Sequence, residues 1–151
     1  MKKVVSILLI LFMLIPAFAM ADVSGLEGKI DAITAYIGEP ITLQMMVFGA
    51  TEVYEKINEK LMELYPEIAE KVKIEVVLGG SGDFDVAQKL RLSLAASETL
   101  PDIVRLNYTQ LAEFAEAEIL MDITDYIKPY EDNIIEGAKQ LMQYDGTYYA
   151  F

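Results

Sequence analysis

The 151-residue sequence contains no cysteine, no histidine and no tryptophan. Without cysteine the chain forms no disulfide, so its fold must rest on its hydrophobic core alone. Histidine is the commonest catalytic base, and cysteine thiolates are common nucleophiles and zinc ligands. Because both residue types are absent, we expect a protein that is not an enzyme and that holds neither a metal nor a cofactor.

Basic residues are also scarce, with 12 Lys+Arg against 24 Asp+Glu. The first 21 residues hold two lysines and no acidic residue, so removing them lowers the net charge from −12 to −14. Such an acidic chain is a poor partner for nucleic acid or for an anionic lipid surface. The acidic residues are spread along helix-like stretches, where solubility is their plainest role.

Residues 1–21 have the pattern of a secretory signal peptide. An apolar stretch over residues 4–15 follows two lysines, and Ala19-Met20-Ala21 is a small-x-small cleavage signal. The apolar stretch is shorter than the roughly 20 residues that span a membrane, and a retained N-terminal anchor is the alternative. No cysteine stands at the cleavage site to carry a lipid anchor. We therefore expect cleavage after Ala21 and release into a periplasm, where a second membrane retains the protein.

The chain after the cleavage site begins with a lead-in segment, residues 22–40, and continues with a strand, a helix and a strand. The apolar run 41–48 predicts a first strand, and the run 72–78 predicts a second. Between them, Thr51 is a reasonable N-cap for a helix that ends before Pro66. Four residues of that helix fall on one face, which we expect to be core: Tyr54, Ile57, Leu61 and Leu64. Strand, helix and strand at this spacing predict parallel strands.

A glycine-rich segment, Gly79–Asp85, closes the second strand and leads into a helix predicted for residues 85–97. The segment resembles one calcium-binding nonapeptide of a β-roll, but it occurs once and has Phe84 where that repeat needs Asp. It also lacks the lysine of a phosphate-binding P-loop. Asp83 and Asp85 form a carboxylate pair of the kind used in acid–base chemistry, although the abundance of carboxylates makes this weak support for an enzyme.

A third strand is predicted for residues 102–106, because Pro101 fixes φ and lacks an N–H, so that a strand begins after it. The strand delivers a polar and aromatic turn, Asn107-Tyr108-Thr109-Gln110, in which Thr109 is placed to cap a helix over 111–118. In open α/β sheets ligands bind at the carboxyl ends of the strands. The alternative is an ordinary strand-to-helix turn whose polar side chains are merely solvated.

The last third of the chain reads as turns around 121–130, a helix near 134–142, a tight turn at 144–147 and a strand over 148–151. We expect Tyr148 and Tyr149 to support the fold rather than to bind a ligand. The pattern stops inside a strand, which suggests a truncated lobe.

Three segments in this order resemble the extracellular solute-binding proteins of ABC importers, in the family that includes many sugar-binding members. They are Leu94-Ala95-Ala96-Ser97 followed by Leu100-Pro101-Asp102-Ile103-Val104, then residues 120–127 (LMDITDYI), then residues 145–151 (DGTYYAF). The resemblance covers residues 41–151. It implies an α/β periplasmic-binding-protein-like lobe with a mostly parallel sheet flanked by helices, the N-terminal lobe of a two-lobed fold whose second lobe is absent here. Such proteins close their lobes over a solute by a hinge motion.

By the same resemblance, the ligand lies against the loops that follow the first three strands. The residues carried over by position are Gly49, Thr51, Glu52, Asp83, Phe84, Asn107, Tyr108 and Thr109. The carboxylates, amide and hydroxyls among them suit the hydroxyl groups of a carbohydrate, and Tyr108 or Phe84 would stack on a sugar ring. The sequence is equally consistent with Phe84 being buried in the core at the start of its helix.

The function implied is binding of a small solute, a carbohydrate in the first instance, and its delivery to the permease subunits of an ABC transporter. Two alternatives stay open at this point. One is an exported sensor or interaction module, and the other is a truncated product without function, whose unfinished lobe exposes a sheet edge and apolar surface.

Overall fold

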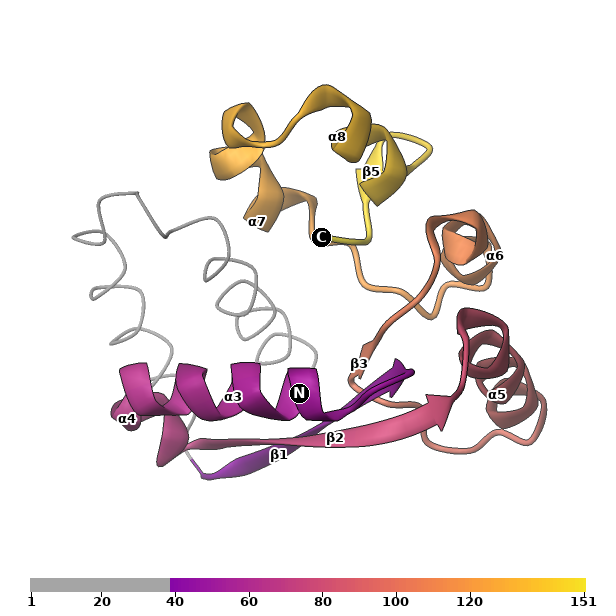
Figure 1. The fold of residues 1–151 in the computed structure, drawn as a ribbon. Coiled ribbons are helices and arrows are strands. Elements are labelled where there is room, and N and C mark those ends of the chain that lie inside the picture. Colours follow the sequence, from indigo (N-terminus) through magenta and orange to yellow (C-terminus); the bar gives the residue numbers. More distant parts are fainter. Residues whose placement is uncertain (1–38) are drawn as a thin grey trace. The chain divides into compact units, whose positions relative to one another are not determined.

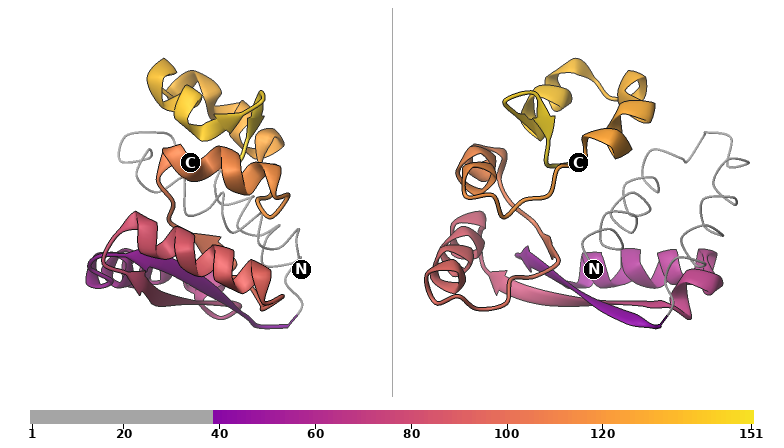
Figure 2. Two further views of the ribbon diagram at one scale, coloured as in Figure 1. Left: turned by 90° about the vertical axis from the view of Figure 1, so that its right-hand side faces the viewer. Right: turned by 180° about the vertical axis from the view of Figure 1, so that it is seen from behind.

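The computed structural model describes residues 39–151, which divide into two compact units, the first ending at Arg105 and the second covering Leu106–Phe151. Figures 1 and 2 show the described elements, and each unit is treated by itself below. The predicted signal peptide, residues 1–21, and nearly all of the lead-in, residues 22–40, lie outside the described residues. Within the described residues no helix has the length and apolar character needed to cross a membrane.

The first unit is built on a three-stranded parallel sheet in the order β2-β1-β3. The strands are β1 (Ile41–Phe48), β2 (Val72–Gly80) and β3 (Ile103–Val104). The predicted βαβ unit is therefore confirmed, with β2 running two residues further than expected. Alternate side chains of the central strand, Leu43, Met45 and Val47, are buried, as the two-residue period of a strand requires.

The third strand was predicted over residues 102–106 but covers only Ile103–Val104. Pro101 has no N–H to donate, and Asp102 joins the ladder partly through its side chain. The Asp102 N–H donates to the Gln44 carbonyl (3.0 Å), while the Asp102 carboxylate accepts the Gln44 N–H (2.9 Å). After two regular pairs, the Arg105 N–H closes the ladder on the Met46 carbonyl (2.8 Å).

The helices of this unit are α3 (Glu52–Leu64), α4 (Pro66–Ala69) and α5 (Asp83–Ala95). The predicted core stripe of α3 is only partly right. Leu61 is buried and Tyr54 half-buried, but Ile57 and Leu64 are exposed, so the helix buries a narrower face than its apolar pattern suggests. Thr51 is the N-cap residue of α3, as predicted, but its side chain makes no capping bond.

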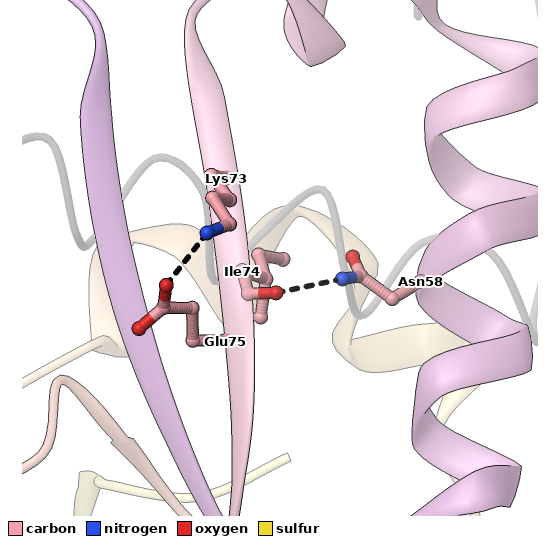
Figure 3. A network of polar contacts seen from close by, with 4 residues as sticks. All are labelled: Asn58, Lys73, Ile74 and Glu75. Atoms are coloured by element: carbon pink, nitrogen blue, oxygen red, sulfur yellow. Dashed lines mark hydrogen bonds and ion pairs between the residues drawn. The ribbon is translucent and has the colours of Figure 1, made fainter.

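The helix α3 makes a polar contact with the backbone of β2 (Figure 3). The Asn58 amide donates to the Ile74 carbonyl at 3.1 Å, whereas Lys73 and Glu75, either side of Ile74, pair with each other at 2.7 Å. Within the described sheet β2 is an edge strand, and exposed edge carbonyls invite pairing with another chain. Asn58 satisfies one of them, and it thereby fixes α3 against the sheet.

The second unit contains short elements. They are the 3-10 helix η1 (Tyr108–Gln110), α6 (Leu111–Glu116), α7 (Thr124–Ile127), the 3-10 helix η2 (Lys128–Asn133), α8 (Glu136–Met142), β4 (Gln143–Tyr144) and β5 (Thr147–Tyr148). β4 and β5 form an antiparallel hairpin whose turn residues, Asp145 and Gly146, both have positive φ (49° and 76°). That pair of angles suits a two-residue hairpin, so the predicted tight turn is confirmed.

Tyr148 organises the second unit and is 2% exposed. Its N–H donates to the Thr124 hydroxyl (3.0 Å), its carbonyl accepts the Ile123 N–H (2.9 Å), and its hydroxyl donates to the Glu131 carboxylate (2.7 Å). Burial, and then the bond to Glu131, raise the pKa of Tyr148 above its ordinary value of 10.0. The supporting role predicted for this tyrosine fits these contacts, although the strand around it covers only Thr147–Tyr148.

Candidate functional site

The carboxyl ends of β1 and β2 finish side by side. A register shift at the end of β1 sets Phe48 opposite Gly80, and the Gly49 N–H then donates to the Gly80 carbonyl at 3.1 Å. This bond joins the two loops that follow the strands. It brings to one end of the sheet the five predicted site residues that lie in the first unit: Gly49, Thr51, Glu52, Asp83 and Phe84.

In the first loop, the chain turns sharply and enters α3. Gly49 has a φ of +78°, a left-handed conformation that residues with a side chain rarely adopt. The half-buried Thr51 accepts the Glu55 N–H on its carbonyl (3.0 Å), and its hydroxyl makes no capping bond. Glu52 is exposed in the first turn of α3. The loop thus presents a hydroxyl and a carboxylate.

In the second loop, one carboxylate holds the backbone in place. Asp85 accepts hydrogen bonds from the Ser81 N–H (2.7 Å), the Ser81 hydroxyl (2.9 Å) and the Gly82 N–H (3.1 Å). The Ser81 hydroxyl first, then the N–H groups of Gly82 and Ser81, hold the pKa of Asp85 below its ordinary value of 3.8. These bonds begin α5 two residues before the predicted start, and they give Asp85 a structural role. Asp83 does not share these bonds.

Phe84 is the second residue of α5 and is 76% exposed. The core position that the sequence equally allowed is therefore wrong. Large aromatic side chains are usually at least partly buried, and the neighbouring Val86 and Ala87 are fully buried. An exposed aromatic ring beside a polar loop is available for stacking on the apolar face of a ligand.

Arg105 is a residue of this end of the sheet that the sequence predictions missed. It directly follows β3, and its guanidinium lies 3.9 Å from the centroid of the Phe48 ring and 5.5 Å from that of Tyr54. The same guanidinium donates to the Phe48 carbonyl at 3.3 Å. The available signal was a lone basic residue at the end of an apolar strand in an acidic chain.

The other three predicted site residues, Asn107, Tyr108 and Thr109, open the second unit. The Asn107 amide oxygen accepts both the Thr109 N–H (3.1 Å) and the Thr109 hydroxyl (3.0 Å). Asn107, and not Thr109 as predicted, therefore caps this turn. Its N–H is in turn bound by the buried Gln110 side chain at 3.2 Å. Tyr108 is 60% exposed, so its ring too is accessible.

The candidate site residues can bind a ligand by hydrogen bonding and by aromatic stacking. At its strand ends the first unit presents hydroxyl, carboxylate and guanidinium groups and the exposed phenyl ring of Phe84. Such sets of polar groups with aromatic surface fix and orient small polar ligands. No cluster of three His, Cys, Asp or Glu side chains suited to a metal ion occurs in residues 39–151.

Comparison with protein families gives one match. The family model described as "Bacterial extracellular solute-binding protein" matches residues 50–150. No curated protein matches the chain.

Three solved structures with the same fold are carbohydrate complexes. The ABC transporter associated binding protein from B. animalis subsp. lactis Bl-04, in complex with beta-1,6-galactobiose, is 20% identical with a TM-score of 0.61, covering 73% of this chain and 25% of that one. The galacto-N-biose-/lacto-N-biose I-binding protein of the ABC transporter from Bifidobacterium longum, in complex with lacto-N-biose, is 22% identical (TM-score 0.57; 74% and 28%). Maltose-bound MalE3 of T. maritima is 23% identical (TM-score 0.59; 71% and 27%). The chain thus spans about a quarter of the length of these proteins and shares their fold.

Proposed function

The chain belongs to the bacterial extracellular solute-binding proteins, and on that premise we propose that it binds a small carbohydrate and delivers it to the permease subunits of an ABC transporter. The carbohydrate is suggested by the ligands of the three similar structures, which are all disaccharides. The protein acts by binding and release, with no reaction of its own. Its place of action is the periplasm, after cleavage of residues 1–21.

Within this proposal, residues 41–151 form the N-terminal lobe of a two-lobed binding fold. The single observation that carries the ligand site is Phe84, which is 76% exposed on the first turn of α5. Leaving a phenyl ring in water forgoes the free energy gained by burying it, so a packing role does not explain its place. Stacking on a sugar ring does explain it, with Thr51, Glu52 and Asp83 near the same strand ends to bind the sugar hydroxyls.

The test is a calorimetric titration of the exported protein with β-1,6-galactobiose, lacto-N-biose and maltose. We expect saturable binding of at least one disaccharide. Phe84→Ala should weaken that binding roughly 3- to 10-fold, the range given by the loss of one aromatic stacking contact. Asp83→Ala should also weaken it, through lost hydrogen bonds to sugar hydroxyls.

Leu92→Ala is the matched control, because Leu92 is a large apolar residue on the same helix that is 62% exposed. It should leave the affinity unchanged, and neither Leu92→Ala nor Phe84→Ala should shift the melting temperature appreciably. Full affinity in Phe84→Ala would show that the ligand binds elsewhere. Failure of every disaccharide to bind would contradict the carbohydrate proposal itself.

A further inference from the structure

Arg105 has an unusual electrostatic position for a chain of this composition. Acidic residues outnumber basic ones by 24 to 12, so a guanidinium that served stability alone would readily find a carboxylate. Yet no carboxylate of the described residues forms an ion pair with Arg105, whereas three lysines do form such pairs. The contacts of its guanidinium are one carbonyl and two aromatic rings.

Those contacts fix the guanidinium while leaving most of its donors unused. A guanidinium carries five N–H groups, and the bond to the Phe48 carbonyl at 3.3 Å uses one of them. The Phe48 ring supports the guanidinium plane from 3.9 Å. Stacking of this kind orients the planar fork in advance, so little side-chain entropy remains to be lost when an anion binds. Arg105 is also exposed, so the free donors are accessible.

The place of the guanidinium ties it to the proposed ligand site. Arg105 follows β3, and the atom it binds belongs to the last residue of β1, at the strand ends where Thr51 and Asp83 lie. A planar guanidinium pairs with a carboxylate through two parallel N–H···O bonds. The single positive charge of Arg105 matches a singly charged carboxylate better than a phosphate dianion.

Resting on the proposed function, we infer that the solute is an acidic sugar, a hexuronic acid or an oligosaccharide that contains one, and that Arg105 binds its carboxylate. Arg105 then determines the specificity of the site for acidic over neutral sugars. The purely structural alternative is that Arg105 only joins β3 to the end of β1 through its stack and its carbonyl bond. The two roles differ in what the ligand's charge should do.

The experiment compares two ligands that differ in the carboxylate alone: the α-1,4-linked dimer of galacturonic acid and the α-1,4-linked dimer of galactose. The exported protein should bind the acidic dimer at least about 10-fold more tightly in calorimetric titration, the gain typical of charge-assisted hydrogen bonds. Arg105→Gln should weaken acidic-dimer binding by about 10- to 100-fold and leave neutral-dimer binding within about twofold. Arg105→Lys keeps the charge but loses the planar fork, so it should fall between.

Lys73→Gln is the matched control, because it removes one positive charge near the start of β2, far along the strand from the carboxyl ends. It should change neither affinity. Raising the salt concentration should weaken acidic-dimer binding by the wild type and have little effect on Arg105→Gln.

The outcomes separate this inference from the proposed function. Binding of the neutral dimer as tight as that of the acidic dimer, with the same ratio in Arg105→Gln, would overturn the inference and leave carbohydrate binding in place. Equal weakening of both dimers by Arg105→Gln would assign the residue a structural role only and would also overturn it. Failure of both dimers and of every neutral disaccharide to bind would contradict the inference and the proposed function together.

Discussion

A single glycine in the second site loop provides a sharp test of the packing described here. Substituting Gly80 by alanine would put a Cβ 2.1 Å from the Asp85 Cβ and 2.6 Å from the Asp85 carboxylate. Carbon atoms in contact lie about 3.5–4.0 Å apart, so the two residues must separate by more than 1 Å. The Asp85 Cβ is bonded directly to the backbone of α5, and no side-chain rotation can move it away. The start of the helix must therefore shift from the end of β2.

That shift has two costs. Overpacking of a well-filled site typically costs about 1–3 kcal/mol, and the Asp85 bonds that hold the start of the helix are lost as well. We therefore expect Gly80→Ala to lower the free energy of unfolding by about 1–3 kcal/mol. For a chain of this size that corresponds to a fall of roughly 3–9 °C in the melting temperature. Circular dichroism at 222 nm during heating, with urea titration as a second measure, would detect it.

Gly82 offers the control two residues further along the same loop. A Cβ at Gly82 meets no atom within 4 Å, and its φ of −143° is open to any residue. Gly82→Ala should therefore be neutral, or slightly stabilising through the reduced entropy of the unfolded chain. Equal melting temperatures for Gly80→Ala and Gly82→Ala would refute the close approach of α5 to the end of β2.

Two other substitutions test single polar contacts. The pKa of Asp85 is lower in the folded protein than its ordinary value of 3.8, so its hydrogen bonds stabilise the fold above that pH and the contribution disappears as the pH falls through the lowered value. Asp85→Asn should accordingly melt below the wild type at pH 7, with the difference narrowing as thermal melts are taken down toward pH 2; a constant difference would contradict this role. Tyr148→Phe keeps the buried ring and removes the hydroxyl with its bond to Glu131, so it should cost about 1 kcal/mol, seen as a lower urea midpoint with an unchanged slope. An unchanged midpoint would show that the hydroxyl contributes nothing to stability.

Much of the fold of the first unit could be predicted from periodicity. The apolar runs 41–48 and 72–78 each provide enough β-branched and aliphatic residues to form a buried strand, and the helix between them is long enough to carry the chain back for parallel pairing. The third strand was overestimated, because its length depends on which donors β1 presents to it. The Asp102 carboxylate accepts the N–H of Gln44 on β1. The two residues are 58 positions apart, so no local sequence pattern predicts this contact.

The candidate site, too, could be predicted only in part from the sequence. The loops that follow the strands were predictable, since parallel strands end at one edge of a sheet, and five of the expected residues do lie there. Which side chains are free to bind was decided by hydrogen bonds and packing that the residue types alone do not specify. Asp85 is occupied by the backbone of its own loop, whereas Phe84 is left exposed.

The sequence by itself thus determined the α/β class, the parallel order of the first two strands and the hairpin turn at Asp145 and Gly146, because each depends on residues close together in the chain. Only the tertiary structure set the guanidinium of Arg105 on the Phe48 ring, from 57 positions away. Local pattern determines which elements form. The chemistry at their ends depends on contacts between residues far apart in the sequence, and these contacts form only when the strands pair.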